Sequence, residues 1–376
     1  MTEIYFDNSA TTPVSDNVLL KINDVMKNYY GNPSSLHLKG YKASEILEES
    51  RKTVALELNA DSAEIIFTGS GTESNNIAVL GAALSKKRRG RKIVSTSIEH
   101  PSVARCLDKL SSDGFDVVRL KADAHGNISK EQLFEAIDRD TVLVSVMYVN
   151  NEIGSILPIE CIKNALYAKE SQAIIHCDAV QAFGKMPIDV KNLGVDLLSC
   201  SAHKIGGPKG VGALYIKKGT TISQTVFGGG QEKGLRSGTQ NIPFIAGFAE
   251  AVREIGSKQN NFMQMKALSA ALKNWLLGIP GVVIHSDSNA FPSIVSFSAA
   301  SIKSEVLLHF LEKKGIYVSN GAACAKGRES EVMRACGIAD DLIKSAVRVS
   351  FSHKNTISEV SELISAIKDA KQKLCT

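Results

Sequence analysis

The sequence predicts an α/β protein in which a mainly parallel sheet is flanked by helices and followed by a smaller α+β domain. At 376 residues, the chain is long enough for a large core and more than one domain. Between residues 64 and 216, short apolar runs alternate with helical patterns. This alternation implies crossover connections between parallel strands, and the ligand site of such a sheet lies beyond the carboxyl ends of its strands.

The expected strands and helices of this first part follow one another in pairs. Each strand is short and apolar, as in sheets that are buried on both faces. The strand–helix pairs are residues 64–67 and 72–84, 92–95 and 101–110, 117–120 and 128–137, and 141–149 and 159–169. Two further apolar runs, residues 173–177 and 195–200, complete the expected sheet.

The pattern changes after Gly228-Gly229-Gly230. A long helical pattern then runs from about Pro243 to Gly278. Beyond it we expect strands at 281–284, 294–297, 316–318 and 347–351, and helices at 304–314 and about 356–373. We therefore assign residues 15–255 to a large domain, and residues 1–14 and 256–376 to a small domain with a loop at about 320–333.

The composition is that of an ordinary globular protein, with 44% apolar and 22% charged residues. The net charge of +5 comes from 44 basic and 39 acidic residues. The densest basic cluster, residues 86–92, lies between a helix and a strand, where a solvated turn explains it best. A dock for an acidic partner or RNA is the alternative, and we expect no direct nucleic acid binding.

The cysteines indicate a reducing compartment. There are seven, an odd number, and none forms a Cys-x-x-Cys pair, which argues against a disulfide framework or a zinc site. The start of the chain is acidic and polar, unlike a secretory leader, and the apolar run at 142–149 is far too short to span a bilayer. We expect a cytoplasmic protein with no membrane contact and no metal.

Lys204 and Asp178 carry the strongest chemical signal. Lys204 stands where a buried strand meets the glycine-rich loop at 205–210, and Asp178 directly follows another apolar strand. A lysine that forms a Schiff base and an acid that pairs with a pyridinium nitrogen are the two main protein contacts of pyridoxal phosphate (PLP). Gln181 could bond the phenolic oxygen of the ring. A surface-loop aspartate is the alternative for Asp178.

Two more strand ends carry polar motifs. Residues 69–76 place glycines and a threonine at the start of a helix, which suits a phosphate, although a capped turn would look the same. His100 could stack on a planar cofactor and move protons, or simply belong to a helix-capping loop. His203 is ambiguous, and His176, inside an apolar strand, is better interpreted as a buried structural residue.

The small domain adds a cysteine and an arginine. Cys324 lies in a small, polar, charged loop at 319–330, where Lys326 and Arg328 could lower its pKa. The other six cysteines lie mostly in apolar contexts. Arg348, within a strand pattern, could clamp a substrate carboxylate, with an ordinary ion pair as the alternative.

Taken together and in order, these motifs resemble the NifS/IscS-like cysteine desulfurases of aminotransferase class V, a PLP-dependent family. The resemblance runs nearly end to end. It rests on residues 5–13, 31–35, 71–75, 99–100, 149–154, 178–181, 203–210, 236–239, 321–324 and 347–350.

The resemblance implies a fold type I PLP-dependent transferase that acts as a homodimer. Lys204 would bind PLP covalently, with Asn151 nearby, His100 stacked on the ring, and Asp178 and Gln181 holding it. The substrate carboxylate would lie against Arg348, next to Asn32. The implied phosphate ligands are Gly71, Thr72, Ser201 and His203, with Thr239 from the partner subunit.

The resemblance also implies a reaction. Lys204 would move protons on bound L-cysteine, the Cys324 thiolate would attack the substrate sulfur, and L-alanine would leave. The resulting persulfide would pass its sulfur to an acceptor protein, such as an iron–sulfur scaffold, a tRNA-thiolating enzyme or a thiamin-pathway carrier. Ala322 replaces the serine usual in the family, and the stretch after Cys324 is shorter and carries Ser330-Glu331. These departures bear on the choice of acceptor.

Three other interpretations fit the same scaffold. A selenocysteine lyase would depend less on Cys324, because selenium leaves more readily. A docking platform without catalysis would not need Lys204, Asp178 and His100. An aminotransferase would give no role to a cysteine in a charged loop.

Overall fold

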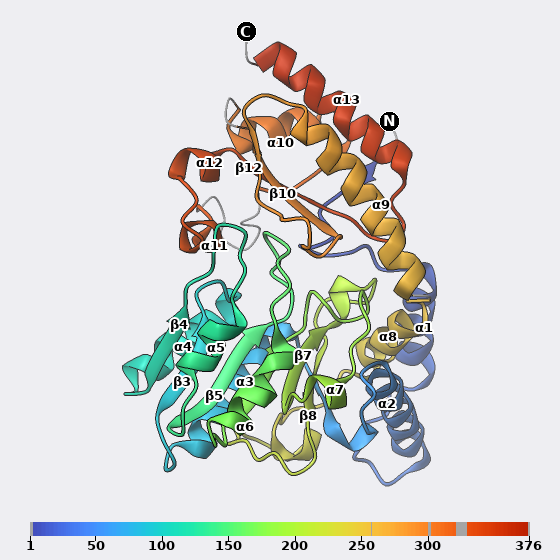
Figure 1. Ribbon diagram of the computed structural model, residues 1–376. Helices are drawn as coiled ribbons and strands as arrows, with labels where there is room; N and C mark the ends of the chain where they lie inside the picture. The colour runs from blue at the N-terminus through green and yellow to red at the C-terminus, as the bar shows by residue number, and fades with distance from the viewer. Residues whose placement is uncertain (1–2, 257, 300–301, 321–328, 375–376) are drawn as a thin grey trace.

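The computed structural model describes residues 3–256, 258–299, 302–320 and 329–374. Figure 1 shows a large sheet flanked by helices in the lower half of the view and a smaller sheet in the upper half, near both chain termini. No helix within these described ranges is long and apolar enough to cross a bilayer.

The large sheet has seven strands and is mainly parallel, as predicted. Strands β4, β3, β5, β6 and β7 run parallel, whereas β8 is antiparallel to both β7 and β2. The strand order is β2 (Ile65–Thr68), β8 (Gly212–Ile216), β7 (Leu197–Ser201), β6 (Ile174–Asp178), β5 (Thr141–Met147), β3 (Lys92–Thr96) and β4 (Asp116–Leu120).

Both faces of this sheet are buried because successive side chains of a strand point to opposite sides. Ile93 packs in one core with residues of α3 (Gly71–Lys86) and α4 (Pro101–Ser112). Val94 packs in the other, with residues of α5 (Lys130–Ala136), η2 (Ile159–Cys161), α6 (Ile162–Ala168) and α7 (Val190–Leu193). The strands therefore have the continuous apolar runs seen in the sequence.

Beside the sheet lie α1 (Asp16–Asn28), α2 (Leu38–Glu57) and α8 (Ile242–Arg253), and both α1 and α2 pack on α8 (Figure 1). The continuous helix expected from Pro243 to Gly278 is wrong. The structure has α8 and a separate helix, α9 (Lys258–Leu277). Gly256, at φ +63°, lies between them, and a glycine in this left-handed conformation commonly ends a helix.

The upper region holds two small sheets. One is antiparallel, in the order β12 (Ala346–Ser350), β10 (Ile294–Ala299) and β9 (Val282–Ile284). In the other, β1 (Ile4–Tyr5) pairs in parallel with β11 (Ile316–Tyr317). The helices here are α9, α10 (Ser304–Glu312), α11 (Glu331–Ala335), α12 (Asp340–Lys344) and α13 (Ile357–Leu374). The proposed domain boundaries remain a prediction.

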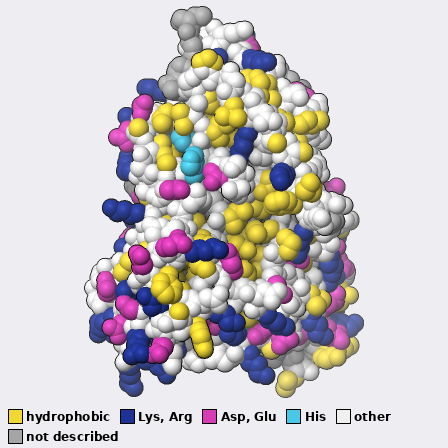
Figure 2. Space-filling model, in the orientation of Figure 1, with side chains coloured by type: hydrophobic (Ala, Val, Ile, Leu, Met, Phe, Trp, Pro, Cys, Tyr) yellow, Lys and Arg dark blue, Asp and Glu magenta, His cyan; other side chains and the backbone are white. Residues whose placement is uncertain are grey.

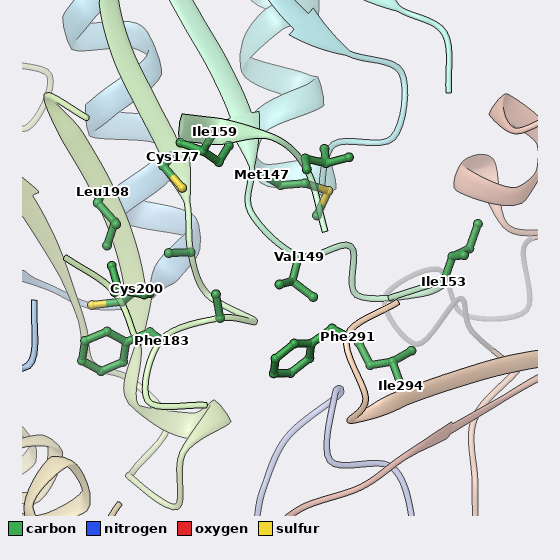
Figure 3. Packing of buried hydrophobic residues seen from close by; sticks show 14 of the residues in the cluster. Met147, Val149, Ile153, Ile159, Cys177, Phe183, Leu198, Cys200, Phe291 and Ile294 are labelled. Carbon is green, nitrogen blue, oxygen red and sulfur yellow. The ribbon is translucent and has the colours of Figure 1, made fainter. Parts of the chain in front are cut away.

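One hydrophobic core runs from the large sheet into the upper region. Figure 3 shows part of it, with Cys177, Leu198 and Cys200 from the strands of the large sheet, Phe291 from the segment that leads into β10, and Ile294 from the start of β10. All five side chains are fully buried. The shared core holds the upper region over the carboxyl ends of the large sheet's strands.

Candidate active site

A cavity of about 690 Å³ lies at the carboxyl ends of the large sheet's strands. Its lining includes residues from the segments that follow five strands of the sheet, β2, β3, β5, β6 and β7, and Arg348 from β12. Among them are ten residues that the sequence singled out: Gly71, Thr72, His100, Asn151, Asp178, Gln181, Ser201, His203, Lys204 and Arg348. This is the position at which an open α/β sheet binds its ligand.

Lys204 ends the 3-10 turn η3 (Ala202–Lys204), which directly follows β7. Its Nζ donates to the carbonyls of Ser9 at 2.5 Å and Ala10 at 2.7 Å. The loop that follows is compact: a side chain on Gly207 would meet the Ala202 carbonyl oxygen at 2.9 Å. The N-terminal segment, remote in sequence, thus supplies acceptors for the lysine amine inside the cavity.

Asp178 is the last residue of β6 and is 5% exposed, which excludes a surface-loop aspartate. Its Oδ2 accepts from Asn75 Nδ2 at 2.7 Å, and its Oδ1 accepts from Val180 N at 3.0 Å. Asn75 Nδ2 also donates to Ser102 Oγ at 2.8 Å. Sequence reasoning did not single out Asn75 or Ser102, although Asn75 lies in the glycine-rich motif at 69–76.

His100 both caps a helix and faces the cavity, so its two interpretations are compatible. At the N-terminus of α4, its Nδ1 accepts from Ser102 N at 3.2 Å and lies 2.7 Å from Ser102 Oγ. Burial lowers the pKa of His100, as does Lys204, while Asp178 opposes the shift. The ring is therefore neutral near pH 7, and since Nδ1 is an acceptor, the proton is on Nε2.

The other end of the cavity suits an anion. Gly71 opens α3, and a side chain there would meet Val180 Cγ2 at 2.7 Å. Ser201 Oγ is buried without a hydrogen-bond partner among the described residues. Burial and nearby basic side chains, of which Lys204 has the largest effect, lower the pKa of His203 to about 3, so it is neutral. A helix N-terminus, a close glycine and an unsatisfied hydroxyl together fit a phosphate group.

Arg348 is fully buried in the middle of β12. Its Nη2 lies 2.7 Å from Asp7 Oδ1, and its Nη1 donates to the Asn151 carbonyl at 2.8 Å. The ion pair offered as the alternative is therefore present, yet Arg348 also lines the cavity. Asp7 was not predicted as a site residue, although the motif at 5–13 contains it.

The sequence pattern of the aminotransferase class-V family matches residues 4–363, nearly the whole chain. The chain belongs to this family. Among its class-V relatives, a Methanosarcina thermophila protein named cysteine desulfurase IscS is 39% identical, with 99% of this chain and 92% of the relative covered. A Nostoc cysteine desulfurase is 36% identical over 100% of this chain and 94% of its own.

Solved structures agree with this class-V assignment. A NifS-like protein has a TM-score of 0.93 and 37% identity, covering 99% of this chain and 100% of the other. A structure described as SspA in complex with cysteine has a TM-score of 0.83 and 32% identity, with 94% of this chain and 100% of that one covered. The predicted NifS/IscS resemblance and the fold class are confirmed.

Sequence reasoning missed two carboxyl groups in the lining of this cavity, those of Glu99 and Glu152. Burial raises the pKa of Glu99 to about 8, although its Oε1 accepts from Thr96 Oγ1 at 2.7 Å and Met147 N at 3.0 Å. Burial raises the pKa of Glu152 to about 7, and this carboxylate accepts from Ser330 Oγ. Both side chains line the cavity. Their neighbours in sequence, His100 and Asn151, were the residues predicted.

The cavity does not include every predicted residue. Gly71, Asn151, Gln181 and His203 line it, whereas Asn32 and Thr239 are exposed in loops outside its lining. Cys324, with Lys326 and Arg328, lies outside the described residues. His176 is fully buried between the hydroxyls of Ser145 and Ser199, as its structural interpretation predicts.

The described cysteines of this class-V chain are poor nucleophiles. Burial raises the pKa of Cys106 to about 11 and of Cys336 to about 12, and it also raises the pKa of Cys161, Cys177 and Cys200. All five are free thiols. Within the described ranges, no cluster of three or more His, Cys, Asp or Glu side chains could hold a metal ion.

Proposed function

We propose that this protein is a PLP-dependent cysteine desulfurase, which converts L-cysteine to L-alanine and passes on the sulfur. The observation that carries the proposal is that Lys204, Asp178 and His100, from three separate strand ends, face one cavity with an anion cradle at one end. The cysteine desulfurase names of the relatives support the same activity.

The cavity's residues fit PLP. Asp178, held by Asn75 and Val180, would pair with the pyridinium nitrogen, and the neutral His100 ring would stack on the cofactor. Ser201 Oγ has an unused hydrogen-bonding capacity that a phosphate would fill, beside Gly71, Thr72 and His203. When bound, PLP supplies an electron sink that stabilises negative charge on the substrate α-carbon.

Lys204 would hold the cofactor and then move the proton of the substrate α-carbon. Its amine bonds two backbone carbonyls, of Ser9 and Ala10, so a neutral or a charged amine can keep a fixed position. His100, neutral and protonated on Nε2, can donate a hydrogen bond into the same cavity.

Arg348 would bind the carboxylate of L-cysteine, with Asn32 adjacent. A guanidinium pairs with a carboxylate through parallel hydrogen bonds, and burial strengthens this interaction. Asp7 holds one side of the group through Nη2 and fixes its orientation. The solved relative in complex with cysteine supports this substrate.

Cys324 would accept the sulfur. Its thiolate attacks the sulfur of the bound substrate, the S–C bond breaks with its electron pair returning to the substrate carbon, and a persulfide is left on Cys324. Attack requires a thiolate, and the raised pKa values of the five described cysteines leave them protonated near neutral pH.

The active form would be a homodimer in which Thr239 of one subunit reaches the phosphate site of the other. Exposed apolar side chains support a second copy as the partner. Figure 2 shows such side chains gathered across the middle of one face. The most exposed large apolar residues include Leu36, Leu38, Tyr30, Tyr41 and Phe227. The sulfur acceptor would be a separate protein in the cytoplasm, an iron–sulfur scaffold or a thiolation enzyme.

One experiment tests the activity and its sulfur carrier. The purified protein should show the visible absorbance of lysine-bound PLP, and with L-cysteine and a reductant it should release alanine and sulfide in equal amounts. Lys204→Ala should abolish both signals. Cys324→Ala should keep the absorbance and lose sulfide release, while the control Cys161→Ala should keep both the absorbance and sulfide release. Full desulfuration by Cys324→Ala would refute the assignment of the sulfur carrier.

A further inference from the structure

Lys185 is a lysine beside the cavity that the proposed reaction does not use. It lies in the turn segment that follows β6, where Lys185 N donates to the Ala182 carbonyl at 3.0 Å. The preceding Gly184, at φ +71°, tolerates no side chain, because a Cβ would meet Ile205 and Ile255 carbons at 2.8 Å. The constrained backbone at Gly184 therefore fixes the position of the Lys185 Cα atom, from which its side chain extends.

The contact of interest joins Lys185 to Gln181, one helical turn earlier. Lys185 Nζ donates to Gln181 Oε1 at 3.2 Å, and Gln181 Nε2 donates to the Ser9 carbonyl at 3.0 Å. Gln181 is 5% exposed and lines the cavity. The same Ser9 carbonyl accepts from Lys204 Nζ. A hydrogen-bonded path thus runs from Lys185 to the lysine in the cavity.

This pair of partners determines which way the Gln181 amide faces. The Ser9 carbonyl oxygen can only accept, whatever the charge of Lys185, and the ammonium form of Lys185 can only donate. If the amide were flipped, its NH₂ group would face an ammonium and its oxygen would face a carbonyl, leaving both ends unsatisfied. Only the observed orientation satisfies both neighbours, and it leaves the second hydrogen of Nε2 available to the cavity.

The charge of Lys185 is costly in this place. Burial, Lys204 and Arg348 all lower the pKa of Lys185, to about 7. The two charged groups that shift its pKa, Lys204 and Arg348, are both cations and repel the ammonium. Neither of them can stabilise a charged Lys185 as an ion-pair partner. Among the residues that the structure describes, the side chain to which this amine donates is that of Gln181.

We propose that Lys185 is a positioning residue that holds the Gln181 amide with its NH₂ group toward the cavity, where it donates to the phenolic oxygen of PLP. The inference rests on the proposed function, because the oxygen belongs to that cofactor. Lys185 itself touches neither the cofactor nor the substrate in this scheme. Without Lys185, the Gln181 amide could rotate, and its NH₂ group would face the cavity for only part of the time.

The test measures the dissociation constant of PLP on cofactor-depleted full-length protein, by absorbance titration. Lys185→Met and Gln181→Leu should each weaken PLP binding about fivefold, the factor that corresponds to about 1 kcal/mol, a typical hydrogen bond. The double variant should bind no more weakly than either single variant, because both remove one interaction. Lys185→Arg, which still donates, should bind nearly as well as the wild type.

Two further variants serve as an independent check and as a control. Gln181→Glu keeps an acceptor for Lys185 but has no NH₂ group, so it should weaken PLP binding as much as Gln181→Leu, even if Lys185→Met fails to fold. Lys191→Met, at an exposed lysine nearby, should leave PLP binding unchanged. The inference alone is overturned if wild-type protein binds PLP and Lys185→Met or Gln181→Glu binds it equally well, or if the losses multiply in the double variant. If wild-type protein takes up no PLP, the proposed function falls as well.

Discussion

At the scale of single residues, the site depends on hydrogen bonds that join distant parts of the chain. Asn75 links Asp178 to Ser102, and Ser102 in turn contacts His100. The buried carboxylate of Asp178 needs its donors, because a buried charge that loses a partner is strongly destabilised. Asn75 therefore supports both Asp178, which would pair with the ring nitrogen, and His100, which would stack on the ring.

Asn75→Ala should consequently weaken PLP binding about tenfold and lower the melting temperature, because it removes one donor from Asp178 and one from Ser102. The control is Asn76→Ala, whose side chain donates only to the carbonyls of Thr72 and Ser102. Absorbance titration with PLP and thermal unfolding measure the two effects. Equal PLP affinity in wild-type protein and Asn75→Ala would contradict the role given to this residue.

His176 makes a pH-dependent contribution to stability. Burial lowers its pKa from 6.5 to about 4, so between these values the unfolded chain binds more protons than the folded one. The stability contributed by neutral His176 is complete above pH 6.5 and is lost as the pH falls toward 4, in total about 3 kcal/mol.

His176→Gln should keep hydrogen bonds to Ser145 and Ser199 but remove this titration. Denaturant unfolding between pH 4 and 7 should therefore show a flatter pH dependence for His176→Gln than for the wild type. Parallel pH profiles for wild-type protein and His176→Gln would show that burial of His176 does not shift its pKa as described.

At the scale of elements, α11 begins at the cavity wall. Ser330 caps this helix, accepting from Met333 N at 2.9 Å, and its hydroxyl also donates to the buried Glu152 carboxylate. A second link joins Glu331 to Arg105 of α4 at 3.0 Å, although both of these side chains are exposed and the pair contributes little. The Ser330–Glu152 hydrogen bond thus connects the start of α11 to the loop after β5.

Ser330→Ala should remove both the N-terminal cap of α11 and the hydrogen bond to Glu152. Losing a serine cap costs about 1 kcal/mol, so amide hydrogens of residues 331–335 should exchange about fivefold faster. Ser129→Ala removes the cap of α5 alone and should change exchange there, but not in α11. Hydrogen-exchange mass spectrometry provides the measurement. Unaltered exchange in α11 would contradict a stabilising role of Ser330 in this helix.

At the scale of the whole molecule, the two regions share one core, and this predicts cooperative unfolding. Phe291 is fully buried in that core, and its backbone N donates to the Gly154 carbonyl at 2.7 Å. Phe291→Ala should destabilise the protein by about 3–5 kcal/mol, while Tyr167→Ala, at an 88% exposed side chain, should have little effect.

Fluorescence of Trp275, the single tryptophan, reports on α9, and far-UV circular dichroism reports on the whole chain. The two transitions should coincide, and separate midpoints would contradict a shared core.

The sequence predicts most of this architecture because alternation of apolar runs is a local signal. The mainly parallel sheet and the placing of Lys204, Asp178 and His100 at strand ends follow from it. The hydrogen bonds of Asn75 and the ion pair of Asp7 with Arg348 do not, since their partners are 103 and 341 residues apart in sequence. The break between α8 and α9 depends on one glycine inside a helical pattern, which periodicity alone overlooks.

The pairing of β1 with β11 and of Asp7 with Arg348 has a consequence for synthesis on the ribosome. The first strand has to wait unpaired while more than three hundred residues are translated, because its partner strand begins at Ile316. The helices and parallel strands of the large sheet can form in the meantime, as early-emerging segments do. The wall of the cavity formed by Ser9 and Ala10 therefore closes last, and uptake of PLP by nascent chains should report that translation has passed Arg348.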